Sequence, residues 1–128
     1  MKPIIKILLI AIITTSFMHA STKYYQCDEQ MIVQANGKTS LFKNNPTYHA
    51  LIDKKRVIIK LTDDIMFTLD YIQHGTSSDG VPYNLYGKKS GNIFAAIYDN
   101  FKRGVKVMNV KNDSEVIITN CKLLEEEK

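Results

Sequence analysis

Turn residues divide the chain from residue 21 onward into short runs, and this spacing leaves no room for long helices. The runs are rich in β-branched and aromatic residues, and reversals such as Asn36-Gly37 separate them. Met66–Ile72 is the clearest run, because apolar and polar residues alternate along it with the period of a half-buried strand. No window of about twelve residues carries the apolar stripe of a helix. The pattern therefore predicts an all-β fold.

Short reversals join the predicted strands, and such strands pair as antiparallel neighbours. A meander of about eight strands closes most easily into a small antiparallel β-barrel or a flattened sandwich. Asn36-Gly37 suits a two-residue type I′ turn, in which both residues take positive φ. We expect a break at Asn44-Asn45-Pro46 and a polar loop over Gln73–Gly80. The strand-like runs from which about eight strands would form are Tyr24–Cys27, Met31–Ala35, Lys38–Phe42, Tyr48–Ile52, Arg56–Leu61, Met66–Ile72, Val81–Lys88, Ile93–Tyr98, Val105–Val110 and Glu115–Leu123, with a frayed tail after them.

The first twenty residues have the layout of a secretory signal peptide. Two lysines give a positive start, the stretch from Ile4 to Phe17 is almost entirely apolar, and Ala20 is a small residue at the cleavage position. The apolar stretch is short for a membrane span of about 20 residues. We expect cleavage after residue 20, with cleavage after Ser16 and an uncleaved anchor as the alternatives. Residues 21–128 would then form a single periplasmic or secreted domain without stable membrane insertion.

Two cysteines, Cys27 and Cys121, lie near the two ends of the expected mature chain. An exported chain with two cysteines most simply forms one disulfide. No Cys-x-x-Cys spacing supports a redox function, and the residues before Cys27 lack the small-residue motif of a lipidated cysteine. The bridge would join the first strand to the last and stabilise the fold by roughly 4–5 kcal/mol in the chain-entropy model.

Charge and composition argue against several classes of function. Without Lys2 and Lys6 the net charge falls from +4 to +2, and the other basic residues are scattered, so we expect no nucleic-acid partner. The mature chain contains only His49 and His74 and no closely spaced ligand set, so we expect neither a metal nor a cofactor. No nucleophile elbow or phosphate loop occurs, and Asp63-Asp64 suits a turn, so we expect no enzyme.

Tyrosine content and one loop segment favour a binding function instead. The chain has seven tyrosines and no tryptophan, and a tyrosine offers a large, stiff contact surface with a polar tip. Most of these rings would line the core or stiffen strands. Residues 75–91, however, concentrate Ser, Gly, Tyr and Lys in and beside a loop. Because function gathers in loops that a rigid scaffold holds, this segment is the candidate binding site.

Three stretches of the chain resemble the periplasmic and membrane-bound inhibitors of c-type lysozyme. Tyr25–Glu29 and the strand after it resemble the opening of these inhibitors, where an aromatic residue and a cysteine precede the first strand. Ser77, Gly80 and Tyr83 fit the family's S-x-x-G-x-x-Y pattern. Val116–Leu123 resembles the closing strand with its bridging cysteine.

The resemblance implies an antiparallel β-barrel that inserts a loop into the lysozyme cleft. In this family a serine, and a lysine from an aromatic-x-Lys-Gly motif, meet the two catalytic carboxylates of the enzyme. Ser77 would be the serine here, and Tyr86-Gly87-Lys88 is the nearest match to the second motif, which makes Lys88 the cation. Lys89 stands where the motif has glycine. An alternative register uses Ser90 as the hydroxyl and Arg103 as the cation.

The resemblance thus implies a c-type lysozyme as the partner. The alternative is a periplasmic binding or immunity module with the same barrel, whose partner is another cell-wall-acting protein. A domain with a charge near +2 would gain no long-range attraction to cationic lysozymes, so recognition would depend on the contact itself. The implied target-binding residues are Ser77, Gly80, Tyr83, Tyr86 and Lys88.

Overall fold

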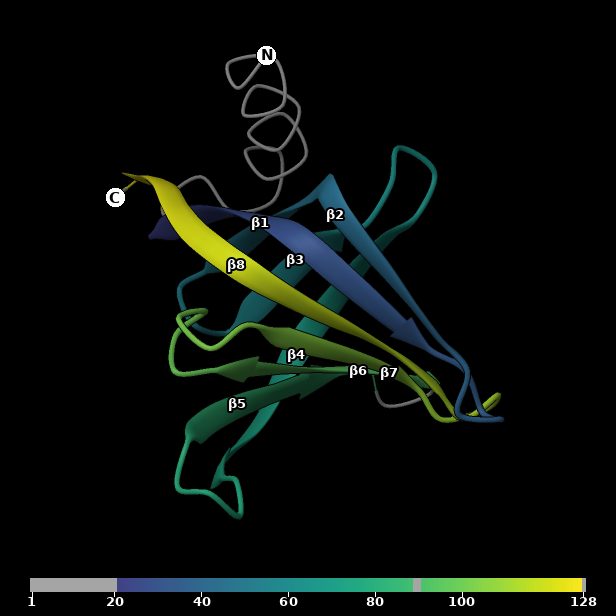
Figure 1. Cartoon of the computed structure of the whole chain (residues 1–128). Helices are drawn as coiled ribbons and strands as arrows, with labels where there is room; N and C mark the ends of the chain where they lie inside the picture. Colours follow the sequence, from purple (N-terminus) through teal and green to yellow (C-terminus); the bar gives the residue numbers. More distant parts are fainter. Residues whose placement is uncertain (1–20, 89–90, 128) are drawn as a thin grey trace.

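The computed structural model describes residues 21–88 and 91–127, and its eight strands form one closed barrel. Each strand pairs antiparallel with the next one in sequence, and β1 pairs with β8 to close the ring (Figure 1). The predicted all-β meander is confirmed, whereas the expected leader, residues 1–20, lies outside the described residues. The strands are β1 (Thr22–Val33), β2 (Thr39–Ile52), β3 (Arg56–Lys60), β4 (Met66–Thr76), β5 (Pro82–Gly87), β6 (Ile93–Tyr98), β7 (Val105–Asn109) and β8 (Ser114–Glu127).

The predicted break at Asn44-Asn45-Pro46 is a bulge inside a continuous strand. β2 runs through this segment, and Asn44 takes a φ of 59° there. The register between β1 and β2 shifts between Cys27 and Glu29, so that Asp28 faces the extra residues of β2. A bulge bends and twists a strand without ending it. The turn-forming residues therefore bend the barrel wall where we expected the chain to reverse.

Strands β4 and β8 extend past their predicted ends. β4 continues to Thr76 rather than Ile72, and β8 continues to Glu127, where we expected a frayed tail. In both cases a neighbouring strand supplies the backbone hydrogen bonds: β5 pairs with the end of β4, and β1 pairs with the end of β8. Polar side chains do not prevent such pairing, because one face of an antiparallel sheet can be solvated.

The Asn36-Gly37 reversal differs from the predicted type I′ turn. Gly37 has a φ of 85°, but Asn36 is not among the residues with positive φ. The Gly37 amide donates to the Gln34 carbonyl and the Gln34 amide donates to the Lys38 carbonyl, each at 2.9 Å. This is a three-residue turn of type I followed by a left-handed glycine. The Asn36 side chain accepts a hydrogen bond from the Lys38 amide at 2.9 Å, which supports the longer turn.

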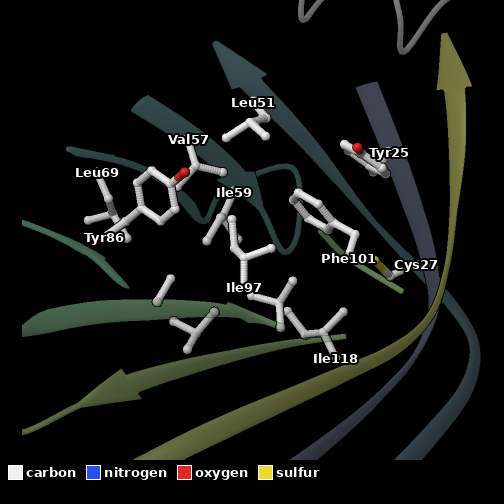
Figure 2. Close-up of a cluster of buried hydrophobic side chains, with 13 residues drawn as sticks. Tyr25, Cys27, Leu51, Val57, Ile59, Leu69, Tyr86, Ile97, Phe101 and Ile118 are labelled. Atoms are coloured by element: carbon white, nitrogen blue, oxygen red, sulfur yellow. The ribbon is translucent and has the colours of Figure 1, made fainter. Parts of the chain in front are cut away.

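The barrel interior holds one apolar cluster to which all eight strands contribute, because alternate residues of each strand point inward (Figure 2). Burial of this surface is the main source of stability for the fold. A second buried cluster, Tyr24, Ala50, Ile52 and Ile58, lies on the opposite face of β1–β3. The interior cluster comprises Tyr25, Cys27, Leu51, Val57, Ile59, Leu69, Tyr86, Ala95, Ile97, Phe101, Val105, Val107 and Ile118.

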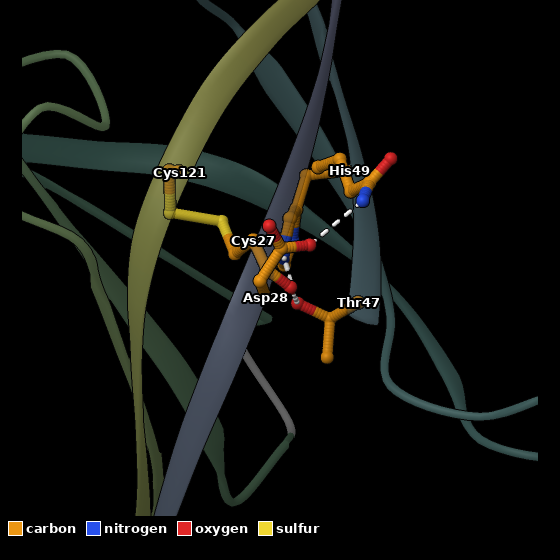
Figure 3. Close-up of a disulfide and its surroundings, with 6 residues drawn as sticks. Cys27, Asp28, Thr47, His49 and Cys121 are labelled. Atoms are coloured by element: carbon orange, nitrogen blue, oxygen red, sulfur yellow. Dashed lines mark hydrogen bonds between the residues drawn. A yellow bond between two sulfur atoms is a disulfide. The ribbon is translucent and has the colours of Figure 1, made fainter. Parts of the chain in front are cut away.

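The predicted disulfide between Cys27 and Cys121 is present (Figure 3). The two residues are register partners in β1 and β8, with Cα atoms 3.9 Å apart and a sequence separation of 94. Closing so long a loop stabilises the fold by about 4–5 kcal/mol. Beside the bridge, the Thr47 hydroxyl donates to the Cys27 carbonyl at 3.4 Å and lies 2.8 Å from Nε2 of the buried His49. At Cys27, β1 is therefore joined to β8 by the disulfide and to β2 by the hydrogen bond from Thr47.

Candidate functional site

Two turns meet at one end of the barrel. The β4–β5 turn covers residues 77–81, and the β6–β7 turn covers residues 99–104. Both follow strands that run in the same direction, since β4 and β6 lie two steps apart in an antiparallel meander. The Asp99 amide donates to the carbonyl of Pro82, the residue directly after the 77–81 turn, at 2.8 Å, which holds the two turns side by side. We refer to this end as the Arg103 end and to the opposite end as the Lys88 end.

The 77–81 turn is organised by the side chain of Ser77. Its hydroxyl donates to Oδ1 of Asp79 at 2.6 Å and accepts from the Val81 amide at 3.1 Å. Gly80 has a φ of 86°, and its amide donates to the Ser77 carbonyl at 3.0 Å. Left-handed backbone favours glycine, so this position suits no other residue as well. Ser77 and Gly80, two of the predicted binding residues, therefore shape the turn, and Ser78 and Asp79 are exposed at its tip.

The 99–104 turn is anchored from inside the barrel. Residues 99–101 have φ angles of 48°, 52° and 74°, a conformation that L-residues rarely adopt. The Phe101 side chain compensates, because it is 1% exposed and its ring stacks on Tyr25 with centroids 3.9 Å apart. Lys102 and Arg103, which follow, are exposed. The turn thus presents two cations from a backbone that the core holds in place.

Charges of the two turns act on each other. The pKa of Asp79 is lowered, mainly because the Ser77 hydroxyl and the residue's own backbone amide donate to its carboxylate, and in smaller part because of the positive charge of Arg103. Asp79 and Arg103 are both exposed, so their attraction contributes little to stability. The Arg103 end therefore offers a hydroxyl, a carboxylate and a guanidinium on one surface.

Aromatic rings flank this surface. Tyr83 and Tyr98 lie with ring centroids 5.5 Å apart, and the Tyr83 ring fills the space over Gly75, where a Cβ would lie 2.5 Å from it. The adjoining pocket measures about 90 Å³, well below the roughly 300–1,000 Å³ of typical small-molecule sites. This pocket is therefore too small for a typical small-molecule site. The pocket is lined by His74, Pro82, Tyr83, Asn84, Ile97, Asp99 and Asn100.

The remaining predicted binding residues lie elsewhere. Tyr86 is 1% exposed, its hydroxyl donates to the Lys54 carbonyl at 3.1 Å, and burial raises its pKa to about 12. Lys88 is exposed beyond the six residues of β5, which at roughly 3.3 Å per residue separate it from the 77–81 turn by about 20 Å. The structure therefore does not bring Ser77 and Lys88 together. Ser90, the hydroxyl of the alternative pair, lies outside the described residues.

The structure separates Ser77 from Lys88 and places the 77–81 turn beside Arg103, the cation of the alternative pair. Ser77 comes from the first register and Arg103 from the second, and their turns are neighbours. The order of the strands could have indicated that these two turns are neighbours. In an antiparallel meander, consecutive turns lie at opposite ends of the barrel, and every second turn lies at the same end. Sequence reasoning also missed Asp79. This residue lies within the S-x-x-G segment, at one of the two positions that the motif leaves unspecified.

Residues 21–88 and 91–127 also bear on two other classes of site. This part of the chain contains no group of three or more His, Cys, Asp or Glu side chains that could hold a metal ion. Nor does it contain a helix long and apolar enough to cross a membrane. Comparison of the chain with protein-family models, with curated proteins and with solved structures finds no match.

Proposed function

We propose that this chain inhibits a c-type lysozyme by presenting the Arg103 end of its barrel to the catalytic cleft. The observation that carries the proposal is a hydroxyl-bearing turn next to an exposed guanidinium on one end of a disulfide-tied barrel. The family resemblance requires a hydroxyl and a cation that meet two carboxylates. Ser77 and Arg103 supply these two groups, and Arg103 takes the role that the sequence first suggested for Lys88.

An arginine at this position suits a carboxylate in a partly dry cleft. The guanidinium stays charged when it is desolvated, and its planar set of donors can hold a carboxylate through two parallel hydrogen bonds. The backbone around Arg103 is already fixed by the buried ring of Phe101. Less conformational entropy is lost on binding when the loop is held beforehand. A rigid turn with an exposed arginine therefore supports tight recognition of an acidic cleft.

Asp79 opposes this contact, because its carboxylate has the same sign of charge as the catalytic carboxylates of the enzyme. In the free protein the Ser77 hydroxyl donates to Asp79 at 2.6 Å. Binding would move this hydroxyl, and Arg103, from the internal carboxylate to carboxylates of the target. The affinity is therefore a difference between the hydrogen bond and charge attraction that Asp79 provides in the free protein and the contacts that the target carboxylates provide in the complex.

The direct test is the lysis of a peptidoglycan suspension by a c-type lysozyme, with and without the purified, oxidised protein, at low and physiological salt. We expect dose-dependent inhibition. Arg103→Ala should raise the half-inhibitory concentration by about tenfold or more, because a charge pair in the cleft is lost. Lys88→Ala is the matched control, since it removes an exposed cation from the opposite end and should leave inhibition unchanged.

Asp79→Asn sharpens the same test. Asparagine keeps an oxygen that accepts from the Ser77 hydroxyl, so the turn is retained while the opposing charge is removed. We expect this variant to inhibit several-fold more strongly than the wild type. Equal or weaker inhibition would mean that the 77–81 turn does not approach the catalytic carboxylates.

Two outcomes would redirect the proposal. If folded, oxidised protein at micromolar concentration leaves lysis unchanged, lysozyme is not the target. The alternative, a binding or immunity module for another cell-wall-acting protein, then replaces it. If lysis is inhibited but Lys88→Ala removes the effect while Arg103→Ala does not, the inhibitory surface is the Lys88 end.

A further inference from the structure

The first half of β2 has an unpaired edge. β1 pairs with β2 along almost its whole length, but β3 pairs only with its last residues, Tyr48–Ile52. Among the described residues, no strand pairs with the other edge of residues 39–47. All of residues 39–45 except Ser40 are exposed. The outward backbone amides and carbonyls of this segment are therefore available to another strand.

This edge is apolar and has little protection against pairing. Leu41 is 58% exposed and Phe42 is 41% exposed, and as neighbours in a strand they point to opposite faces of the sheet. Natural edge strands are commonly guarded by charged residues, by proline or by bulges. Here Lys43 and the bulge with Pro46 stand only at one end of the segment. The exposed edge is the five-residue segment Thr39–Lys43, with its one charge at the end.

An apolar row crosses the sheet and ends at this edge. Met31 of β1 pairs with Ile117 of β8 on one side and with Leu41 of β2 on the other. Register partners in neighbouring strands face the same side of a sheet, so the three side chains form one row. Met31 and Ile117 are half-buried, and Leu41 is the exposed end of the row. A further strand with an apolar residue opposite Leu41 would continue it.

We propose that the Thr39–Lys43 edge pairs with the same edge of a second copy of this chain, antiparallel and centred on Leu41. In this register Leu41 faces Leu41 of the second copy, so that the apolar rows of the two chains form one continuous row. Ser40 faces Phe42 of the partner, and Thr39 faces Lys43 of the partner. The only charge on the edge therefore meets a neutral hydroxyl residue, and no like charges oppose each other.

The symmetry of this contact limits its consequences. The same surface is used by both copies, so the pairing closes on two chains and does not propagate into a fibre. Five residues per strand form a small interface, and we expect a weak dimer whose population depends on concentration. The free edge begins at the Lys88 end, because β2 runs from there toward the Arg103 end. Antiparallel pairing would thus point the two Arg103 ends in opposite directions.

A cysteine at the symmetry axis tests the register directly. Across an antiparallel pair, Cα atoms lie roughly 4.5–5.5 Å apart, which is within the range that a disulfide can bridge. Leu41→Cys, incubated with oxidised glutathione, should therefore give cross-linked dimers on a non-reducing gel. Val110→Cys is the matched control, since Val110 is 59% exposed against 58% for Leu41 but lies in the β7–β8 turn. This control should remain monomeric.

Sedimentation of the wild-type protein over a range of concentrations provides a second readout. We expect the average mass to rise with concentration, and Leu41→Lys to abolish the rise while circular dichroism shows an unchanged fold. Leu41→Ser is a milder variant should the lysine disturb folding. A wild type that stays monomeric up to millimolar concentration would overturn the proposal. Cross-linking of Val110→Cys as readily as Leu41→Cys would also overturn it, because the contact would then not be centred on β2.

Discussion

The two ends of the barrel are built by different means. At the Arg103 end, the 99–104 turn inserts Phe101 into the core, where the ring is 1% exposed and stacks on Tyr25. At the Lys88 end, the turns leave apolar side chains in solvent, with Ile65 45% exposed and Val110 59% exposed. An anchor in the core fixes the position of the exposed residues beside it. The contrast teaches that the Arg103 end has the rigidity that a binding surface needs.

The largest expected effect comes from removing the anchor. Phe101→Ala should lower the free energy of unfolding by about 3–5 kcal/mol, because it leaves a cavity among buried rings and no longer offsets the left-handed backbone of the turn. Val110→Ala, at the Lys88 end, should change it by less than about 0.5 kcal/mol. Urea denaturation followed by circular dichroism measures both. Similar losses for the two variants would remove the distinction between the ends.

Low pH should lower the free energy of unfolding through the buried His49. Its ring lies 5.7 Å from that of Phe101, its Nδ1 has no hydrogen-bond partner among the described residues, and burial lowers its pKa from 6.5 to about 3. The unfolded chain then binds a proton that the folded chain does not. Between pH 6.5 and about 3, the free energy of unfolding should therefore fall by about 1.4 kcal/mol per pH unit as the pH falls.

Replacing the histidine checks this contribution. His49→Leu should flatten the pH dependence of stability below pH 6.5, as measured by urea denaturation at several pH values. His74→Asn, which changes an exposed histidine beside the 77–81 turn, is the control and should keep the wild-type slope. If the slope is the same in all three proteins, His49 does not set the acid sensitivity.

Two turn glycines, one at each end of the barrel, should show the smallest and most local difference in stability when each is replaced by alanine. Gly104 has a φ of 92° and a Cβ there would collide with the carbonyl oxygen of Ile118, whereas Gly37 has a φ of 85° and open space around it. Alanine at either position meets backbone strain of about 1–2 kcal/mol. At Gly104 the collision should add about 1–3 kcal/mol. Thermal unfolding of the two variants, with Gly104→Ala expected to melt at the lower temperature, measures the difference.

Much of the fold could be predicted from local signals. Period-two alternation and turn spacing predicted the meander, because both signals are readable within a few residues. The bridge could be predicted because the chain has only two cysteines to pair. The bulge at Asn44-Asn45-Pro46 could not be distinguished from a turn. The same residues suit both, and only pairing of β2 with β1 on both sides of the bulge keeps the strand continuous.

The candidate site was harder to predict, because its residues meet only after the strands pair. Spacing along the chain joined Ser77 to Lys88, while the barrel places them at opposite ends and brings Arg103 to the 77–81 turn instead. The 99–104 segment contained one usable signal, since Phe101 is a large apolar residue in an otherwise polar loop. Such a residue in a loop often marks a side chain that packs into the core.

Closure of the ring by the first and last strands links folding to the order of synthesis. β1 leaves the ribosome before the other described strands, yet one of its edges pairs only with β8, and that pairing extends as far as Glu127. Contacts this distant in sequence form slowly, because a long loop of chain must close before they stabilise the fold. The barrel and its bridge therefore cannot be completed until nearly all of the chain has been made.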